Sequence, residues 1–202
     1  MTGRRYPGRV SDTRAAQRTI VPLAIAFESG LFVLALGFGW LLDTPALATL
    51  RLTWRAAALG LLATAPPLLL MWWLIRTTWA PIRRLNREIE HTVVPLFAGS
   101  TPLQLAAVAL AAGVGEEVLF RGVIQAALAG WSGAAMGLLL TSLLFGLVHL
   151  ITPTYAALAG LLGLYLGALA LYSGNLLAPI LVHALYDVAA LTYWTRKRPA
   201  TE

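Results

Sequence analysis

Two adjacent glutamates and an arginine interrupt one of the most apolar stretches of the chain, GVGEEVLFRG at residues 113–122. A carboxylate or guanidinium at the centre of a bilayer costs about 3 kcal/mol, so each should have a partner or a function. Glu117 and Arg121 have i, i+4 spacing with the acid first, which favours an ion pair within one helix. Glu116 projects about 100° away from Glu117 around that helix. We therefore expect Glu116 to meet polar groups from other helices.

Two further motifs can supply those polar groups. FGLVHL places Phe145 and His149 one helical turn apart on one face. HALYD places His183 and Asp187 one turn apart in the same way. Taken singly, an intramembrane histidine is usually a hydrogen-bonding group between helices, and the Glu117–Arg121 pair is structural. Taken together, ionisable groups inside apolar segments mark a functional site. We expect the following side chains to converge on one polar cavity: Glu116, His149, His183 and Asp187.

These side chains predict hydrolytic chemistry. A carboxylate beside a neutral imidazole can take a proton from water, which then attacks a peptide carbonyl. A second imidazole with a polar partner can stabilise the oxyanion that develops. The same Glu, His, His and Asp could instead ligate zinc and leave one position open for water. The chain has no cysteine, so a thiolate nucleophile and a thiolate metal site are both excluded.

The composition indicates an integral membrane protein. Hydrophobic residues make up 58% of the 202 residues and charged residues 12%, and the mean hydropathy is +0.74. Apolar runs of about 20 residues recur, as helices that cross a bilayer require. We predict an all-α, polytopic transmembrane bundle of about six spans. The predicted spans are Ile20–Leu42, Ala56–Ile75, Leu103–Gly130, Trp131–Leu150, Tyr155–Tyr172 and Leu176–Trp194.

A short amphipathic segment separates the second and third spans. APIRRLNREIEH places Ile82, Leu85 and Ile89 on one helical face and the charged residues largely elsewhere. This pattern predicts an interfacial helix, which we favour over a substrate-gating element. The expected organisation is a basic cytoplasmic tail, two helices with the interfacial segment, a catalytic core and a second basic tail, at residues 1–19, 20–101, 102–195 and 196–202 respectively.

The basic residues predict the orientation. They concentrate in the N-terminal tail, in the loop after the second span and at the C-terminus, so the positive-inside rule places both termini in the cytoplasm. We expect a bacterial inner membrane protein that contacts lipid and a peptide or protein substrate. The net charge of +6 follows from this topology and needs no nucleic-acid partner.

The three motifs also resemble those of a known family. EEVLFR, FGLVH and HALYD are similar to the EExxxR, FxxxH and HxxxN/D motifs of the CPBP (CAAX protease and bacteriocin-processing) intramembrane proteases, which include the type II CAAX prenyl endopeptidases. They occur in the family's order on the third, fourth and sixth predicted spans. The resemblance covers about residues 103–194.

The resemblance implies a role for each residue of the motifs. Glu116 would be the general base, assisted by His149, while His183 and Asp187 would form the oxyanion side. Glu117 and Arg121 would support the site. Prenyl-processing members carry Asn at the position of Asp187, and a carboxylate donates to an oxyanion only when protonated, so Asp187 could instead orient His183. The family is often labelled metalloprotease, but a metal-free glutamate mechanism is also proposed, so zinc stays open and no other cofactor is expected.

Other functions compete with this interpretation. GWSG resembles the nucleophile motif of rhomboid serine proteases, with Ser132 as nucleophile and His183 as base, but it leaves the EEVLFR motif unexplained. The same acids and histidines could serve a proton-linked transporter, or a membrane scaffold or immunity protein. The sequence leaves the surroundings of two residues undetermined. His149 falls near the cytoplasmic end of its predicted span, and for Glu28, in the first span, we favour a structural hydrogen bond over a substrate contact.

Overall fold

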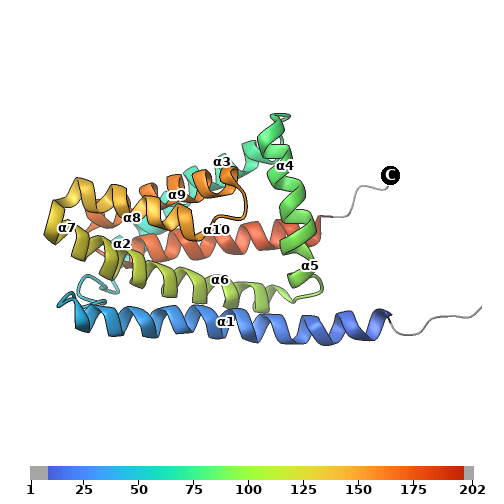
Figure 1. Ribbon diagram of the computed structural model, residues 1–202, viewed down its shortest axis with the longest axis horizontal. Coiled ribbons are helices and arrows are strands. Elements are labelled where there is room, and N and C mark those ends of the chain that lie inside the picture. Colours follow the sequence, from blue (N-terminus) through green and yellow to red (C-terminus); the bar gives the residue numbers. More distant parts are fainter. Residues whose placement is uncertain (1–8, 198–202) are drawn as a thin grey trace, which may run out of the picture.

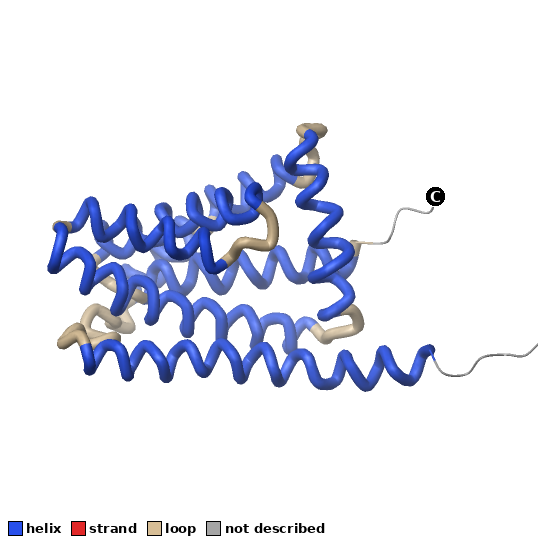
Figure 2. Tube along the Cα trace, viewed as in Figure 1, coloured by secondary structure: helices blue, strands red, loops and turns tan. Residues whose placement is uncertain are grey.

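The computed structural model describes residues 9–197, with side chains from Ile20 onward. Every regular element in that range is helical, and short loops connect the helices (Figures 1 and 2). The predicted all-α fold is confirmed. The helices are α1 (Arg9–Leu41), α2 (Trp54–Ala63), α3 (Ala65–Leu74), α4 (Ala80–Glu88), η1 (Ile89–Val93), α5 (Val94–Phe97), α6 (Pro102–Glu117), η2 (Val118–Gln125), α7 (Ala126–Ser132), α8 (Ala134–Val148), α9 (Pro153–Ser173) and α10 (Leu177–Arg196).

The two predicted tails are described only in part. Residues 1–8 and 198–202 lie outside the described residues. The remainder of the N-terminal tail is helical, because α1 already begins at Arg9 and continues without a break into the first predicted span.

Most predicted spans agree with helices of membrane-crossing length. Within the described range, 5 helices are long and apolar enough to cross a bilayer: Ile20–Leu41, Trp54–Leu74, Pro102–Ser132, Pro153–Ser173 and Leu177–Arg196. The predicted span Trp131–Leu150 corresponds to the shorter apolar helix α8, which begins only at Ala134. Trp131 belongs to α7 instead, because Gly133 separates the two helices with φ 86°, a conformation that glycine tolerates best.

The predicted short amphipathic helix between the second and third spans is present as α4. Figure 1 shows α4, η1 and α5 running across the ends of the long helices, and we call these three elements the crosswise segment. It lies at the same end of the bundle as the first turns of α1 and the last turns of α10. Ile82 and Leu85 on α4 are buried, while Arg83 and Arg84 are exposed. An amphipathic helix in this position covers the bundle with its apolar side and presents cations outward.

The third span contains a π-helical segment that the sequence did not predict. A capping box between Thr101 and Gln104 starts α6, and the helix changes to i→i+5 bonding at η2, directly after Glu117. From there the polar side chains face α9: Arg121 donates to the carbonyl oxygen of Gly163, and Gln125 donates to that of Gly167. The π-helical segment therefore carries Arg121 and Gln125 and begins directly after Glu116 and Glu117.

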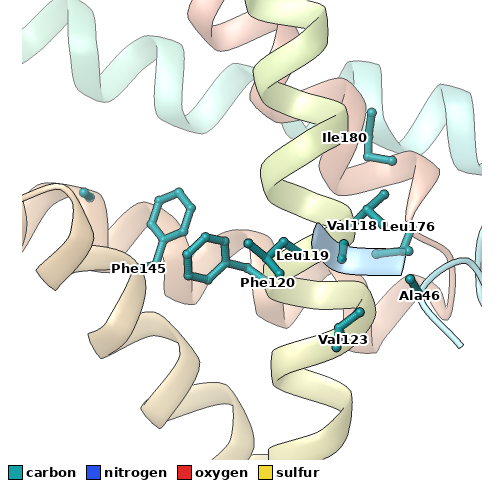
Figure 3. Packing of buried hydrophobic residues seen from close by; sticks show 10 residues of the cluster. Ala46, Val118, Leu119, Phe120, Val123, Phe145, Leu176 and Ile180 are labelled. Atoms are coloured by element: carbon teal, nitrogen blue, oxygen red, sulfur yellow. The ribbon is translucent and has the colours of Figure 1, made fainter. Parts of the chain in front are cut away.

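Close helix packing surrounds the site. The hydrophobic cluster beside it brings residues of η2, α8 and α10 together, with Phe120 and Phe145 in an edge-to-face contact at 4.9 Å between ring centroids (Figure 3). On the other side of α6, Gly115 lies directly against the main chain of Glu28 in α1, where any Cβ would meet the Glu28 carbonyl oxygen. Glycine at 115 therefore sets how closely α1 approaches the residue next to Glu116.

We expect Gly115→Ala to destabilise the protein. The added methyl group must displace the backbone of α1, and overpacking of this kind costs about 1–3 kcal/mol. Heat-induced unfolding of the detergent-solubilised protein, followed by loss of helical circular dichroism, measures the effect. Gly130→Ala is the matched control, because nothing lies within 4 Å of a Cβ at that position. Equal stability of the two variants would contradict the packing described above.

Candidate active site

Four predicted side chains line one cavity. Glu116 from α6, His149 after α8, and His183 and Asp187 from α10 all border a space of about 480 Å³. The apolar remainder of the wall comes from α3, α4, η1, α5, α6, α8, α9 and α10 and from Ile151 in the loop between α8 and α9. The cavity therefore combines a polar end, where the predicted residues meet, with an apolar region beneath the crosswise segment.

Glu116 and His149 face each other. Oε2 of Glu116 lies 3.5 Å from Nε2 of His149. At the other side of the ring, Nδ1 of His149 lies 2.7 Å from the carbonyl oxygen of Phe145. A carbonyl oxygen only accepts, so Nδ1 carries the proton, and a neutral His149 ring presents its unprotonated Nε2 to Glu116. This pairing is the arrangement that water activation requires.

His149 follows a short helix, α8. The helix has 15 residues, so it is about 22 Å long, shorter than the ~30 Å hydrocarbon core of a bilayer. Figure 1 shows the α8–α9 turn ending short of the crosswise segment. His149 directly follows this short helix, and its ring reaches Glu116 there.

Glu117 connects two helices through one oxygen. Oε1 of Glu117 lies 2.7 Å from Nη1 of Arg121, as predicted, and 2.7 Å from Nδ1 of His183, which the sequence did not predict. Glu117 has no exposed surface. Because a carboxylate accepts hydrogen bonds, Nδ1 of His183 donates to it and Nε2 of the same ring points to the other side. Glu117 is therefore the group that orients His183.

Asp187 lies at the opposite edge of the same imidazole. Its Oδ2 is 3.5 Å from Nε2 of His183, longer than an ordinary N–H···O hydrogen bond. The expectation that Asp187 orients His183 is thus met only loosely, because the shorter contact belongs to Glu117. His183 and Asp187 both line the cavity.

Phe145 forms an aromatic contact among the charged groups. Its ring centroid lies 4.4 Å from that of His149 and 6.1 Å from that of His183, and the guanidinium carbon of Arg121 lies 4.5 Å away on the same ring. Such stacking restricts both imidazoles and adds a cation–π contact. The motif FGLVH placed Phe145 one turn from His149, but only the structure shows what it touches.

Two further residues line the cavity. The Glu28 carboxyl group lines the cavity, and its Oε2 is buried without a hydrogen-bond partner among the residues that the structure describes. The structural hydrogen bond that we expected there is not seen at this oxygen. Tyr155 also lines the cavity, with its ring 6.2 Å from that of His149. Glu28 was visible as an acid in an apolar span, whereas nothing in the sequence distinguished Tyr155.

Ser132 lies apart from these residues. It is exposed at the end of α7, its hydroxyl donates to the carbonyl oxygen of Leu128 at 2.8 Å, and it does not border the cavity that contains His183. The geometry therefore gives no support to a serine nucleophile at this position.

The donor groups do not form a metal cage. Across residues 20–197, no group of three or more His, Cys, Asp or Glu side chains is arranged to hold a metal ion. His183 contacts Glu117 through Nδ1, and His149 contacts the carbonyl oxygen of Phe145 through Nδ1, so Nε2 of both rings is left for another partner. Zinc-bound histidines show the same use of the second ring nitrogen, so these contacts do not decide between the two mechanisms. The zinc alternative stays a prediction, and we derive no step through a metal.

A comparison with protein families agrees with the motifs. The model of the type II CAAX prenyl endopeptidase Rce1-like family matches residues 98–189. No curated protein and no solved structure matches the chain. The fold is that of an all-α polytopic membrane protein, and residues 98–189 are similar to the Rce1-like family. The predicted resemblance to the CPBP intramembrane proteases is confirmed over this segment, and it supports a CAAX-type intramembrane protease in general.

We expect Arg121→Met to be strongly destabilising. The variant leaves the Glu117 carboxylate buried without its guanidinium partner, and breaking a buried ion pair costs about 3–5 kcal/mol. Adding Glu117→Gln should restore part of the loss, because the unpaired charge is then removed. Chemical unfolding in detergent measures both variants, and Arg84→Met on the exposed side of α4 is the control. A loss no larger than in the control would show that the pair contributes little.

Proposed function

We propose that this protein is an intramembrane endopeptidase that hydrolyses a peptide bond of a membrane-associated substrate. The single observation that carries the proposal is the facing pair of Glu116 and His149 in a cavity that also receives His183 and Asp187. The family match adds support for a CAAX-type protease in general.

Water activation is the first step of the proposed mechanism. A water molecule between Glu116 and His149 gives one proton to the Glu116 carboxylate and is oriented by the unprotonated Nε2 of His149. Its oxygen then attacks the peptide carbonyl carbon. Oε2 of Glu116 is buried and has no hydrogen-bond partner among residues 20–197, so it is available to this water.

The second step needs a donor for the oxyanion. In its doubly protonated form, His183 donates through Nδ1 to Glu117 and offers Nε2–H to the developing negative charge. Asp187 lies beside Nε2, and it can add a hydrogen bond only in its protonated form. The fixed orientation of His183 then matters because an oxyanion donor must be in place before the charge develops.

Collapse of the intermediate completes the reaction. The C–N bond breaks as the nitrogen takes the proton held by Glu116. The second proton from water also reaches the amine, so one carboxylate and one ammonium are formed from one peptide and one water. No covalent bond to the enzyme is needed, which agrees with the lack of cysteine and with the position of Ser132 away from the cavity.

The surroundings of the site support a substrate that is partly apolar. Leu70, Met71, Leu85, Ile89 and Leu162 belong to the cavity wall. We propose that an apolar segment of the substrate occupies this region while its peptide bond reaches Glu116. Prenylated proteins are a eukaryotic speciality, so a prenylated substrate is no part of the proposal.

The orientation in the membrane is also a proposal. The first turns of α1, the end of α10 and the crosswise segment share one end of the bundle (Figure 1). Arg83, Arg84 and Arg87 of α4 are exposed at that end, together with Lys197. The concentration of cations supports a cytoplasmic location for it, and with it for both termini.

We expect Glu116→Gln to lower cleavage by about 10²–10⁴-fold, the usual contribution of a general base. The amide has nearly the size of the acid but cannot take the proton from water. Quantitative analysis of membrane-protein termini in cells that carry the native chain or the variant identifies substrates, and purified protein in liposomes then gives the rate. Ser132→Ala is the control and should retain activity. Loss in Ser132→Ala with retention in Glu116→Gln would favour the serine mechanism.

We also expect cleavage to survive removal of metal ions. The proposed mechanism uses only side chains of the chain, so dialysis of the purified protein against EDTA and then 1,10-phenanthroline should leave the rate unchanged. The rate of liposome-reconstituted protein before and after treatment measures this. Loss of activity that added zinc restores would contradict the metal-free mechanism and favour the zinc alternative.

A further inference from the structure

Glu28 brings an additional carboxylate to the candidate site from outside the matched core. It lies in α1, whereas the family match begins at residue 98. The main chain of Glu28 packs directly against Gly115, which is the residue before Glu116. Its side chain borders the same cavity as Glu116 and His183. The position of Glu28 is thus set by backbone packing.

Glu28 differs from the other acids of the site because it forms no ion pair with any residue that the structure describes. Glu116 faces His149, Asp187 faces His183, and Glu117 accepts from Arg121 and His183. Oε2 of Glu28 also has no hydrogen-bond partner in that part of the chain, as is true of Oε2 of Glu116 and of Glu117. Glu28 nevertheless lines the same cavity as Glu116, His183 and Asp187.

An acid in this position calls for a ligand. A polar atom buried without a partner is costly, and the cost is higher for a charged group inside a membrane. A carboxylate accepts hydrogen bonds and pairs with cations, so the ligand that satisfies it carries N–H groups or a positive charge. Peptide hydrolysis generates such a group next to Glu116, because the leaving nitrogen ends as an ammonium.

We infer that Glu28 forms a subsite for the amine side of the scissile bond. It accepts the N–H of the substrate's peptide nitrogen and pairs with the ammonium of the product. This inference rests on the proposed endopeptidase function. It makes α1 a functional part of the site and assigns the cavity a preference for a primary ammonium attached to an apolar chain.

The test measures ammonium binding without turnover. Purified protein in nanodiscs of neutral phosphatidylcholine is titrated calorimetrically with hexylammonium and with hexanol, and the heats of empty nanodiscs are subtracted. We expect the native protein to bind hexylammonium at least about tenfold more tightly than hexanol, as a charge-assisted hydrogen bond provides. Glu28→Gln should abolish this preference. Glu88→Gln, on the exposed side of α4, should retain it.

Folding and function are controlled separately. Circular dichroism reports whether Glu28→Gln is folded. If it is not, Glu28→Asp provides the test, because this variant keeps the charge and should retain part of the ammonium preference. An unchanged preference in folded Glu28→Gln, or no preference in the native protein, would overturn the inference. A Glu28-dependent preference in a protein that cleaves nothing would support the subsite and refute the hydrolysis. Cleavage by a native protein that shows no ammonium preference would support the hydrolysis and refute the subsite.

Discussion

One buried carboxylate oxygen determines how the core helices are arranged. Oε1 of Glu117 receives a guanidinium nitrogen of its own span and an imidazole nitrogen of α10, both at 2.7 Å. Inside a bilayer no water can replace either contact, so the helices must keep the rotation that lets both nitrogens reach the oxygen. Arg121 extends the network to α9 through the carbonyl oxygen of Gly163. The orientation of His183 is a consequence of this network.

Two departures from regular span geometry place the remaining groups. The third span changes to π-helical bonding immediately after Glu117, and such segments occur often at functional sites. The fourth predicted span corresponds to the short helix α8, and His149, directly after it, lies beside Glu116. Both features move polar side chains inward, away from lipid, where they can serve one another as partners.

The cavity is lined by the N-terminal half of the chain as well as by the segment that matches the family. Residues 98–189 supply the two histidines and the EEVLFR glutamates. The earlier helices supply much of the apolar wall, through α3 and the crosswise segment, and they supply Glu28. A cavity of this kind needs both parts, because α6 and α10 alone would expose the polar groups to lipid. The core thus carries the proposed chemistry, and the earlier helices form part of the cavity around it.

The sequence by itself determined the helical class, the approximate spans, the interfacial helix and the polar residues worth following. It could do so because hydropathy and i, i+4 spacing are local properties: the Glu117–Arg121 pair was readable from two positions on one helix. It did not determine that Glu117 also contacts His183, that Phe145 touches both imidazoles, or that Glu28 enters the cavity. Those contacts join residues far apart in the chain, and only the packing of helices against one another, at glycines such as Gly115, decided which side chains meet.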